Sequence, residues 1–310
     1  MMDCVLLGSG GMMPMPFRFL TSLAIRFKGH LYMFDAGEGT QISLKKVKLG
    51  IKHLRVLAIS HLHGDHCLGI PGLLMMKSQV KDSPPLTIVG PPGIKSFVAD
   101  IHKHLEFFLN FTITFVEWNE TVSELAYQDE LTQIFWAPLK HTTFCLGYRF
   151  EEKSRPGKFK PDAARALRIP EGPLWGSLQR GENVTLEDGR QILPNQVSGN
   201  IRNGRHICYA VDTRPNKALY RLSKNTDIAF LDGMFLPKHS EEAETRGHMT
   251  ADDAARVASR ANIHKAVLVH ISPRYGFDET KELAAAAAKR YERAEIGKDH
   301  QWYDIVYRDK

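Results

Sequence analysis

Residues 57–74 read "LAISHLHGDHCLGIPGLL", and ligand-type polar side chains crowd into this stretch directly after an apolar run. The run "RVLAIS" (55–60) predicts a buried strand that ends at Ser60. His61 and His63 are two residues apart and cannot share a helical face, so they belong to a turn. A glycine at position 64 allows the backbone to fold tightly there. The turn can therefore gather four side chains around one point: His61, His63, Asp65 and His66.

The composition of this turn favours a metal site. Imidazole and carboxylate groups together suit zinc or a related divalent cation. Four candidate ligands within one turn exceed what a single tetrahedral ion needs from one loop, so we expect two ions. The alternative is a solvated polar loop without function, which the density of ligands at a strand end disfavours.

The same arrangement recurs along the chain, because a polar ligand-type residue follows an apolar run five more times. These residues are Asp35 after "HLYMF", His141 after "QIFWAPLK", Asp212 after "ICYAV", Asp232 after "DIAFL" and His270 after "KAVLV". Strand ends at one edge of a sheet often carry functional groups, since the scaffold is rigid and the loops can vary. Taken singly, each residue is also compatible with a capping or turn role. Taken together, they predict one shared site.

Composition bounds the class of protein. The chain has 310 residues, of which 43% are hydrophobic, enough for one large domain or two ordinary ones. Its four cysteines (Cys4, Cys67, Cys145 and Cys208) form no C-x-x-C pair, which predicts reduced, buried thiols. No signal peptide and no membrane-spanning segment is recognisable, so we expect a cytoplasmic chain without a membrane partner. A net charge of +6 is compatible with a polyanionic partner but does not by itself indicate one.

Short apolar runs alternate with polar loops and a few helical patterns, which is typical of a mixed α/β domain. Strands are predicted at 3–9, 22–27, 30–35, 55–60, 86–90, 112–118, 133–139, 144–150, 207–211, 227–232 and 265–272. Helices are predicted at 71–77, 94–104, 251–260 and 279–293. The third of these helices follows Thr250, a favourable N-cap, and has Asp252 and Asp253 in its first turn.

One segment departs from this alternation. Residues 153–205 are rich in Pro, Gly, Lys and Arg and have only weak apolar periodicity. We interpret this segment, called the arm below, as an insertion that stands off the core.

Several motifs resemble those of a known family. The signature H-x-H-x-D-H of the metallo-β-lactamase superfamily is met in full by His61, His63, Asp65 and His66. The stretches "LGSGGMMPMP", "FDAGEGTQ", "SHLHGDHCLGIPGLL", "GPPGIKSF", "PEGPLWGSLQRGENVTLEDGR", "DTRP" and "HISPRY" together resemble the ribonuclease Z family. Its members are endonucleases that trim the 3′ trailer from precursor tRNA. The metal motif specifies only the superfamily, whereas the Gly-Pro-bearing insertion points to the tRNA-processing family.

This resemblance, which runs to about Tyr275, implies one domain over residues 1–310 of the α+β/α/β class. The implied architecture is an αββα sandwich, two mixed β-sheets flanked by helices, with the arm inserted at 153–205. A dinuclear zinc site is implied between the sheets, with Mn²⁺ or Mg²⁺ as substitutes. By matching motifs, one ion is held by His61, His63 and His141, the other by Asp65, His66 and His270, and Asp212 bridges them.

The resemblance also implies roles in catalysis. Two metal ions can activate a water molecule and clamp a phosphodiester for in-line attack. Asp65 is a candidate acceptor for the proton of that water. His248 in "RGHMTADDA" stands where the family has a catalytic histidine, the acid for the leaving 3′-oxygen, although a surface loop histidine is the alternative. Asp232 in "FLDGMF" matches the carboxylate that partners this histidine.

Two loops depart from the family pattern. The sequence "LDGM" replaces "HEAT", so a shorter carboxylate, that of Asp232, must reach His248. The loop "PMPFRF" keeps Pro14 and Arg18 but lacks the lysine and asparagine of P-x-K-x-R-N, which help to place the RNA near the cut. Arg18 and Arg274, the latter in "HISPRY", are candidate substrate-binding residues.

The arm is basic at its start. Residues 153–170 contain six basic side chains and one acidic one, a local excess of six minus one, or +5. Such an arm can contact RNA phosphates, and the resemblance implies that it grips the tRNA elbow, often across a homodimer. The candidate contacts are Lys153, Arg155, Lys158, Lys160, Gly172 and Pro173. A flexible, soluble loop with a chance charge excess is the alternative.

Three functions therefore remain open. The first is a zinc-dependent endoribonuclease that cleaves the 3′ trailer of precursor tRNA. The second is a hydrolase of small phosphodiesters or related esters, which the two altered loops favour and the arm disfavours. The third is a metal-free RNA-binding relative, disfavoured because no ligand position is missing from the sequence.

Overall fold

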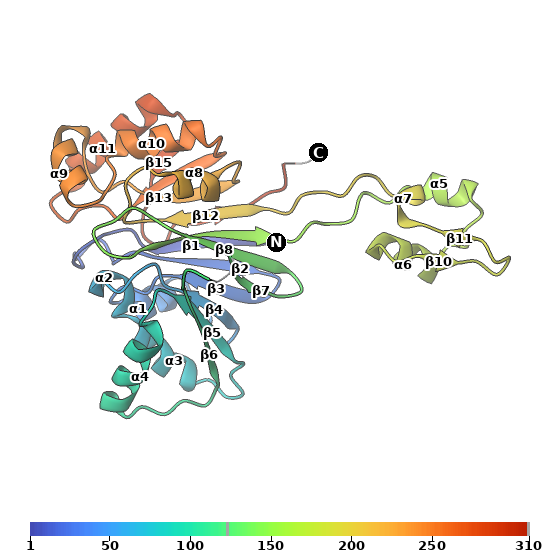
Figure 1. Cartoon of the computed structure of the whole chain (residues 1–310), viewed down its shortest axis with the longest axis horizontal. Coiled ribbons are helices and arrows are strands. Elements are labelled where there is room, and N and C mark those ends of the chain that lie inside the picture. Colours follow the sequence, from blue (N-terminus) through green and yellow to red (C-terminus); the bar gives the residue numbers. More distant parts are fainter. Residues whose placement is uncertain (122–123, 309–310) are drawn as a thin grey trace. The chain divides into compact units, whose positions relative to one another are not determined.

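The computed structural model describes residues 1–121 and 124–308, which divide into two compact units. The core unit consists of Met1–Glu151 and His206–Val306. The arm unit consists of Glu152–Arg205 and C-terminal residues from Tyr307 onward, and it contains the arm. Figure 1 labels most elements of both units. Within the described ranges, the chain contains no helix that is long and apolar enough to cross a membrane.

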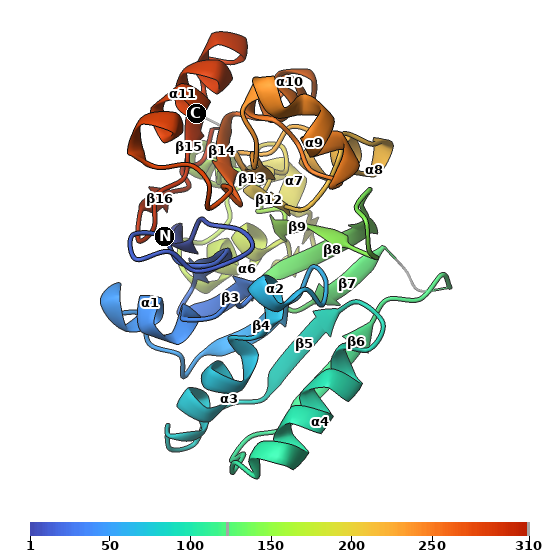
Figure 2. The same ribbon diagram turned by 90° about the vertical axis from the view of Figure 1, so that its left-hand side faces the viewer.

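Two mixed sheets, each with seven strands among the described residues, form the centre of the core unit (Figure 2). The first has the order β16 (Trp302–Asp304), β1 (Met2–Gly8), β2 (Ser22–Phe27), β3 (His30–Phe34), β4 (Leu54–Ala58), β5 (Leu86–Gly90) and β6 (Ile113–Glu117). The second has the order β15 (Ala294–Ile296), β14 (Lys265–Val269), β13 (Ile228–Asp232), β12 (His206–Ala210), β9 (Leu146–Glu152), β8 (Thr132–Pro138) and β7 (Leu125–Gln128). Strands β3 to β6 are parallel, as are β12 to β15, so their carboxyl ends share one edge of each sheet.

Helices cover the outer face of each sheet (Figure 2). On the first sheet these are α1 (Thr40–Lys46), α3 (Ile70–Ser78) and α4 (Ile94–Leu105), while the short α2 (Gly64–Cys67) lies in the turn after β4. On the second sheet they are α8 (Lys217–Ser223), α9 (Ser240–Thr245), α10 (Ala251–Arg260) and α11 (Phe277–Arg290), with the 3₁₀ turn η1 at Pro237–His239. The predicted αββα sandwich is therefore confirmed.

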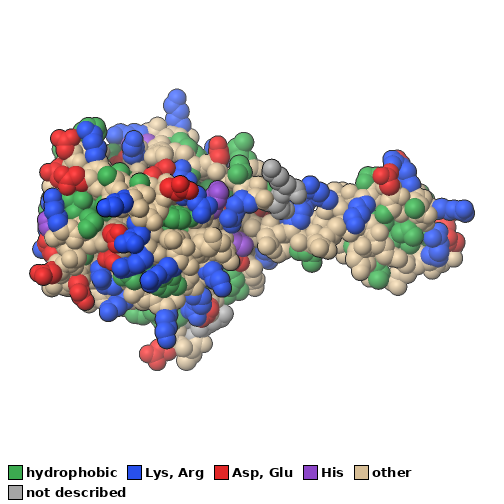
Figure 3. All heavy atoms as spheres, turned by 90° about the horizontal axis from the view of Figure 1, so that it is seen from above, with side chains coloured by type: hydrophobic (Ala, Val, Ile, Leu, Met, Phe, Trp, Pro, Cys, Tyr) green, Lys and Arg blue, Asp and Glu red, His purple; other side chains and the backbone are tan. Residues whose placement is uncertain are grey.

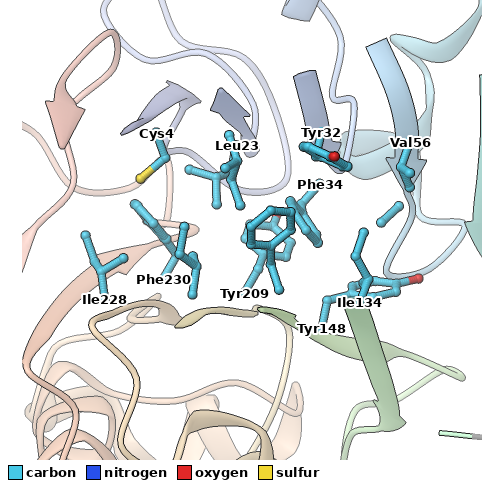
Figure 4. Close-up of a cluster of buried hydrophobic side chains, with 14 of the residues drawn as sticks. Cys4, Leu23, Tyr32, Phe34, Val56, Ile134, Tyr148, Tyr209, Ile228 and Phe230 are labelled. Carbon is cyan, nitrogen blue, oxygen red and sulfur yellow. The ribbon is translucent and has the colours of Figure 1, made fainter. Parts of the chain in front are cut away.

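Alternation along the strands explains why their sequences are apolar on both faces. In β13, Ile228 and Phe230 point between the sheets (Figure 4), whereas Ala229 and Leu231 pack in the layer under the helices. Tyr209 of β12 and Phe34 of β3 meet across the central layer, with ring centroids 5.7 Å apart. A strand that is covered on both faces has no side exposed to solvent, so apolar residues occur at successive positions and not only at every second one. This double burial holds the strand ends, and the loops that follow them, in fixed positions.

The predicted elements agree with the structure in the interior and differ at the edges. The helix predicted at 251–260 is confirmed, and Thr250 caps it by accepting a hydrogen bond from the Asp253 amide at 3.1 Å. The helix predicted at 279–293 instead begins at Phe277 and ends at Arg290. The strand predicted at 144–150 is shifted, since Phe144 and Cys145 precede β9. The short strands β7, β15 and β16 and the helix α1 were not predicted from the sequence, because they show little periodicity. The four cysteines are buried and free.

The arm unit has secondary structure and a small core of its own. It contains α5 (Pro161–Ala166), α6 (Pro173–Arg180), α7 (Pro194–Val197) and the hairpin strands β10 (Val184–Thr185) and β11 (Gln191–Ile192). Its buried apolar side chains are Ala164, Ile169, Leu178, Val184, Leu186, Ile192 and Val197. Lys and Arg side chains stand at the surface of this unit (blue in Figure 3). The weak periodicity of the sequence reflects elements too short to show one.

Candidate metal centre

The site residues lie at the carboxyl edge of the two sheets, as the strand-end pattern predicts. Three of them adopt a left-handed backbone conformation one or two residues past the ends of their strands: Asp35 (φ 55°), Asp212 (φ 49°) and His270 (φ 60°). This conformation costs a residue other than glycine on the order of 1 to 3 kcal/mol. Such a cost persists only where the surrounding structure determines the backbone, and here it fixes the course of the chain as each strand passes into its loop.

One group of potential ligands consists of His61, His63, His141 and Asp212, whose ligand atoms all lie within 4.8 Å of one another. Nε2 of His61 lies 3.5 Å from Oδ2 of Asp212, and Nε2 of His141 lies 3.6 Å from the same oxygen. Burial lowers the pKa of both His61 and His141, which keeps each imidazole neutral and available as a ligand. The structure therefore brings together the first ligand set predicted from the sequence.

A second group consists of Asp65, His66 and His270. Nε2 of His66 and Nε2 of His270 are 3.2 Å apart, and each is within 3.4 Å of Oδ2 of Asp65. Burial by itself raises the pKa of Asp65, but hydrogen bonds from His270 and His66 outweigh burial and hold that pKa far below its usual range. The carboxylate is thus ionised, as a metal ligand must be.

Asp212 faces both groups. Its Oδ2 is directed to His61 and His141, whereas its Oδ1 lies 3.4 Å from Nε2 of His66 and 3.2 Å from Nε2 of His270. Oδ1 of Asp212 and Nε2 of His61 are buried and accept or donate no hydrogen bond within the described part of the chain. Buried polar atoms are nearly always satisfied, so these two orphaned atoms fit coordination of a cation. The donor set as a whole, imidazole and carboxylate, fits a divalent metal.

Hydrogen bonds behind the ligands fix their orientation. Asp35 is fully buried and accepts from four donors: Ser60 N at 2.7 Å, Ser60 Oγ at 2.8 Å, Nδ1 of His66 at 2.7 Å and the Tyr209 hydroxyl at 2.8 Å. Because Nδ1 of His66 is hydrogen-bonded to Asp35, Nε2 of His66 faces the second group of potential ligands. Asp35, which the sequence placed with the other strand-end residues, thus supports the site from behind and lies outside the ligand groups.

Glycine backbone also supports the ligands. Nδ1 of His141 donates to the carbonyl of Gly247 at 3.1 Å, and Gly247 has φ 74°. A Cβ atom on Gly11 would lie 2.5 Å from the His270 ring, so only glycine fits there. Next to it, the amide of Met12 donates to Oδ2 of Asp65 at 2.6 Å. The loop after β1 is therefore part of the site, which no sequence motif for metal ligands indicated.

His248 and Asp232 form the pair that the sequence suggested. Nδ1 of His248 lies 2.8 Å from Oδ2 of Asp232, and the His248 ring stacks on His270 with centroids 5.2 Å apart. Burial lowers the pKa of His248, but the Asp232 carboxylate outweighs burial and raises it above its usual value. His248 is thus a buried member of the site, and the interpretation as a surface loop histidine is wrong.

Asp232 is poorly suited to bind metal, although its ligand atoms also cluster with those of Asp212, His248 and His270. Its Oδ1 accepts from the amides of Met234 and Met249, and its Oδ2 accepts from the amide of Thr213 and from His248. With both oxygens engaged twice, no lone pair is left for a cation. Asp232 therefore orients His248.

Arg214 was not singled out from the sequence, although it stands in the motif "DTRP". Its Nη1 donates to the carbonyl of His248 at 2.8 Å and to Oδ2 of Asp253 at 3.0 Å. It ties the loop after β12 to the backbone of His248 and to the start of α10. Conversely, the predicted contact residue Arg274 is engaged inside the core unit, since it pairs with Glu242 and lies over the Phe235 ring at 5.2 Å.

The remaining predicted contact residues lie apart from the ligand groups. Arg18 is in the loop after β1, is 9% exposed and donates to Oγ1 of Thr280 at 3.2 Å. The others belong to the arm unit. There Lys158 and Lys160 are exposed, Arg155 lies 3.3 Å from the centroid of the Tyr307 ring, and Gly172 and Pro173 form the N-cap and first residue of α6. Lys153 is half-buried.

Comparison with known proteins places these features in context. The model of the beta-lactamase superfamily domain matches residues 183–271, and the model of the anti-Pycsar protein Apyc1 matches residues 2–98. A ribonuclease Z of Treponema denticola is 40% identical over 308 residues, with 99% of each chain covered. A ribonuclease Z of Borrelia hermsii is 36% identical and covers 94% of this chain and 92% of its own.

Solved structures show the same fold. The short form of human tRNase Z superimposes with a TM-score of 0.70 at 22% identity, covering 98% of this chain and 99% of its own. A diphosphatase of the PhnP family superimposes with a TM-score of 0.65 at 15% identity, covering 99% of both chains. At these identities the likeness concerns the fold, which proteins of different activity share.

Proposed function

The chain belongs to the ribonuclease Z family, and we propose that it cleaves the 3′ trailer from precursor tRNA as a zinc-dependent endoribonuclease. The observation that carries this proposal is the position of Asp212, with one carboxylate oxygen directed to each of two ligand groups. A single carboxylate shared in this way is suited to a pair of ions and not to one.

We infer that one zinc is held by His61, His63 and His141, the other by Asp65, His66 and His270, with Asp212 between them. Imidazole and carboxylate ligands without a thiolate suit zinc, and they also admit Mn²⁺ or Mg²⁺. When bound, such an ion pair lowers the pKa of a water molecule and offsets the negative charge of a phosphodiester.

His248 is the proposed proton donor to the leaving 3′-oxygen. Its Nδ1 is engaged by Asp232, so the ring nitrogen that remains for the substrate is Nε2. The Asp232 carboxylate favours the protonated imidazole, which is the form that an acid requires. Arg214 and Asp232 together restrict both the backbone and the ring of His248, and such restriction supports a proton transfer that depends on geometry.

Asp65 is the proposed acceptor for the proton of the attacking water. Its contacts with Met12 and with the two histidines all use Oδ2. Its Oδ1 takes part in none of these contacts, and that oxygen is the one proposed to receive the proton. The side chain is partly exposed, unlike that of Asp212, so solvent can reach it.

For the substrate, we propose that phosphates of the tRNA body contact the arm unit and that Arg274 and Arg18 act nearer the cut. Lys158 and Lys160 support the first part, since both are exposed and no salt bridge engages them in the described ranges. In contrast, Arg165 pairs with Asp162 and Glu171. The basic excess that remains for RNA is therefore smaller than the sequence count suggests.

The family resemblance further leads us to propose a cytoplasmic homodimer. Light scattering of the purified protein would measure its mass directly. A monomer at the concentrations used for cleavage would contradict this part of the proposal without affecting the rest.

The test of the activity is cleavage of a labelled precursor tRNA beside hydrolysis of a chromogenic phosphodiester, with metal content measured on the same samples. We expect a single cut that releases the trailer and two zinc ions per chain. Turnover of the small ester alone would favour a general phosphodiesterase. RNA binding without metal and without cleavage would favour a non-catalytic relative.

A further inference from the structure

A groove of about 1180 Å³ lies within the core unit. Its walls are the loop after β1, the end of α1, the helix α11 and the loop between β15 and β16. Figure 2 shows the loop after β1 between α1 and α11. The volume exceeds the upper end of the range of ordinary small-molecule pockets, roughly 300 to 1,000 Å³, so it suits an extended ligand.

The groove combines positive charge with exposed aromatic rings. Phe17 and Phe277 are 62% and 77% exposed, although large apolar side chains are usually buried. Nζ of Lys281 lies 4.2 Å from the centroid of Phe277, and Nζ of Lys46 lies 4.6 Å from that of Phe19. Alternating cations and aromatic faces are what single-stranded nucleic acid needs, since bases stack on rings and phosphates contact the cations.

A buried arginine supplies a second, independent indication of an anion. Arg18 is 9% exposed and lines the groove, and its Nη2 donates to Thr280. Its Nη1 is buried and has no hydrogen-bond acceptor among the residues that the structure describes. The Asp299 carboxylate favours the charged form of Arg18 but accepts no hydrogen bond from Nη1, and an oxygen of a phosphate group would satisfy this donor.

The acidic side chains of the groove are already engaged. Asp299 accepts from the Ser9 hydroxyl at 2.7 Å and from the Phe19 amide at 2.5 Å. Glu295 is paired with Lys265 at 3.0 Å and also accepts from Gln301. The cations Lys46 and Lys298, in contrast, form no salt bridge with any carboxylate within 1–121 and 124–308. Nζ of Lys281 is paired with Oδ1 of Asp278 at 3.0 Å, so the positive charge that faces a ligand in the groove comes from Lys46 and Lys298.

The loop after β1 joins the groove to the metal centre. Gly11 contacts His270 and the Met12 amide contacts Asp65, while Phe17, Arg18 and Phe19 line the groove. The two parts of the loop are paired, because Gly10 donates to the Phe19 carbonyl at 2.9 Å. A strand of RNA whose phosphate lies at the metal centre could thus follow this loop towards the groove.

We propose that this groove binds the single-stranded 3′ trailer of the precursor, an inference that rests on the proposed function. The body of a tRNA beside the cut is a duplex with its bases paired, so they cannot stack on Phe17 or Phe277. The trailer is unpaired, so its bases are free to stack on these rings. The groove therefore distinguishes precursors by the length of trailer that they carry.

The test compares two precursors that share one tRNA body and differ only in trailer length, one nucleotide against ten. For each enzyme, kcat/KM is measured on both. In Phe277→Ala we expect the ratio of long-trailer to short-trailer kcat/KM to fall by about fivefold or more, since one stacked base contributes that much. Lys298→Ala should also lower this ratio, because it removes a cation available to the trailer phosphates. Phe108→Ala, with an equally exposed phenylalanine (76%), and Lys289→Ala, elsewhere on α11, are the matched controls and should keep the wild-type ratio.

A loss of equal size on both substrates would overturn the proposal, because the groove would then serve the body or the fold. An unchanged ratio together with unchanged rates would overturn it as well, since no RNA would bind there. Failure of the proposed function is a different result: the wild-type enzyme would cleave neither precursor. Circular dichroism of each variant separates loss of fold from loss of binding.

Discussion

Nδ1 of His248 lies 2.8 Å from Oδ2 of Asp232, and this contact joins the loop before α10 to the end of β13. The shorter carboxylate at this position reaches the histidine, so the altered "LDGM" loop keeps the pair together. From this geometry we expect Asp232 to act as a positioning group for His248 and not as a metal ligand. The two residues are therefore expected to act as one unit.

The first prediction follows from that pair. His248→Ala should slow cleavage by roughly 10² to 10⁴, the usual range for loss of a general acid, and keep the metals. In a double-mutant cycle, Asp232→Ala should add little to His248→Ala, because a coupled pair is not additive. Rates and metal content are measured together, and His104→Ala, an exposed histidine on α4, is the control. Fully additive effects would show that Asp232 acts independently.

The second prediction distinguishes the two ligand groups. His63 belongs to one group only, whereas Asp212 faces both. His63→Ala should therefore lose about one zinc per chain, and Asp212→Ala should weaken both sites, with nearly complete loss of activity in each. Elemental analysis after dialysis gives the stoichiometry, with Asp100→Ala, an exposed aspartate on α4, as control. Two tightly bound ions in Asp212→Ala would remove its assignment as the shared ligand.

The third prediction concerns the support behind His66. Asp35→Asn keeps the size of the side chain but removes the charge that holds Nδ1 of His66. Loss of such a partner typically lowers metal affinity about 10- to 100-fold. Tyr209→Phe, which removes one of the four donors to Asp35, should instead cost about 1 kcal/mol of stability and leave affinity closer to wild type. Competition with a chelator measures metal affinity, and chemical denaturation measures the free energy of unfolding. A larger loss of metal affinity in Tyr209→Phe than in Asp35→Asn would contradict the supporting role of Asp35.

The fourth prediction removes the arm. Glu151 of β9 and His206 of β12 are partners in one antiparallel ladder, so residues 152–205 can be replaced by a two-residue Asn-Gly turn. The buried apolar residues of the arm unit all lie within the deletion, and none of the proposed metal ligands does. We expect an intact metal centre, near-normal turnover of a small phosphodiester and a strong loss of affinity for precursor tRNA.

Salt dependence provides the sharper readout for the same deletion. If the arm binds phosphates, the slope of log K against log salt should flatten by about 0.7 to 0.9 for each phosphate that the shortened protein no longer neutralises. The double variant Lys158→Ala, Lys160→Ala should reproduce part of this change, and Arg165→Ala, already paired with Glu171, should reproduce less. Equal loss on the small ester would mean that the arm supports the fold.

The fifth prediction is a pH dependence of stability far from the metal centre. Burial lowers the pKa of Lys77 to about 8, and its Nζ donates to the Lys52 carbonyl and to the Ser83 hydroxyl. The unfolded chain therefore holds this proton up to higher pH than the folded chain does. Between about pH 8 and the unfolded pKa near 10.4, this residue makes the free energy of unfolding rise with pH. Lys77→Met should lack that rise in urea titrations, and an unchanged pH profile would contradict the assignment.

The class of fold and the grouping of the candidate ligands could be read from the sequence because they depend on local patterns. His61 to His66 stand in one turn, and the apolar runs before Asp212 and His270 end where the strands end. Because the interior strands are buried on both faces, their apolar runs are continuous and easily recognised. These strands and the helix 251–260 were therefore predicted well. The short edge strands β7, β15 and β16 gave no comparable signal, since three or four residues do not define a period.

What only the tertiary structure decided are relationships between distant residues. Asp35 proved to support His66 because donors from β12 and from the turn after β4 converge on its carboxylate. The groove is formed by residues from both ends of the chain, Phe17 and Arg18 on one side and Phe277 and Lys281 on the other. A sequence specifies which side chains are present and, through its apolar periodicity, which face of a strand or helix is buried. Distances between segments some 260 residues apart follow only from how the two sheets pack, because each contact depends on all the others in the core.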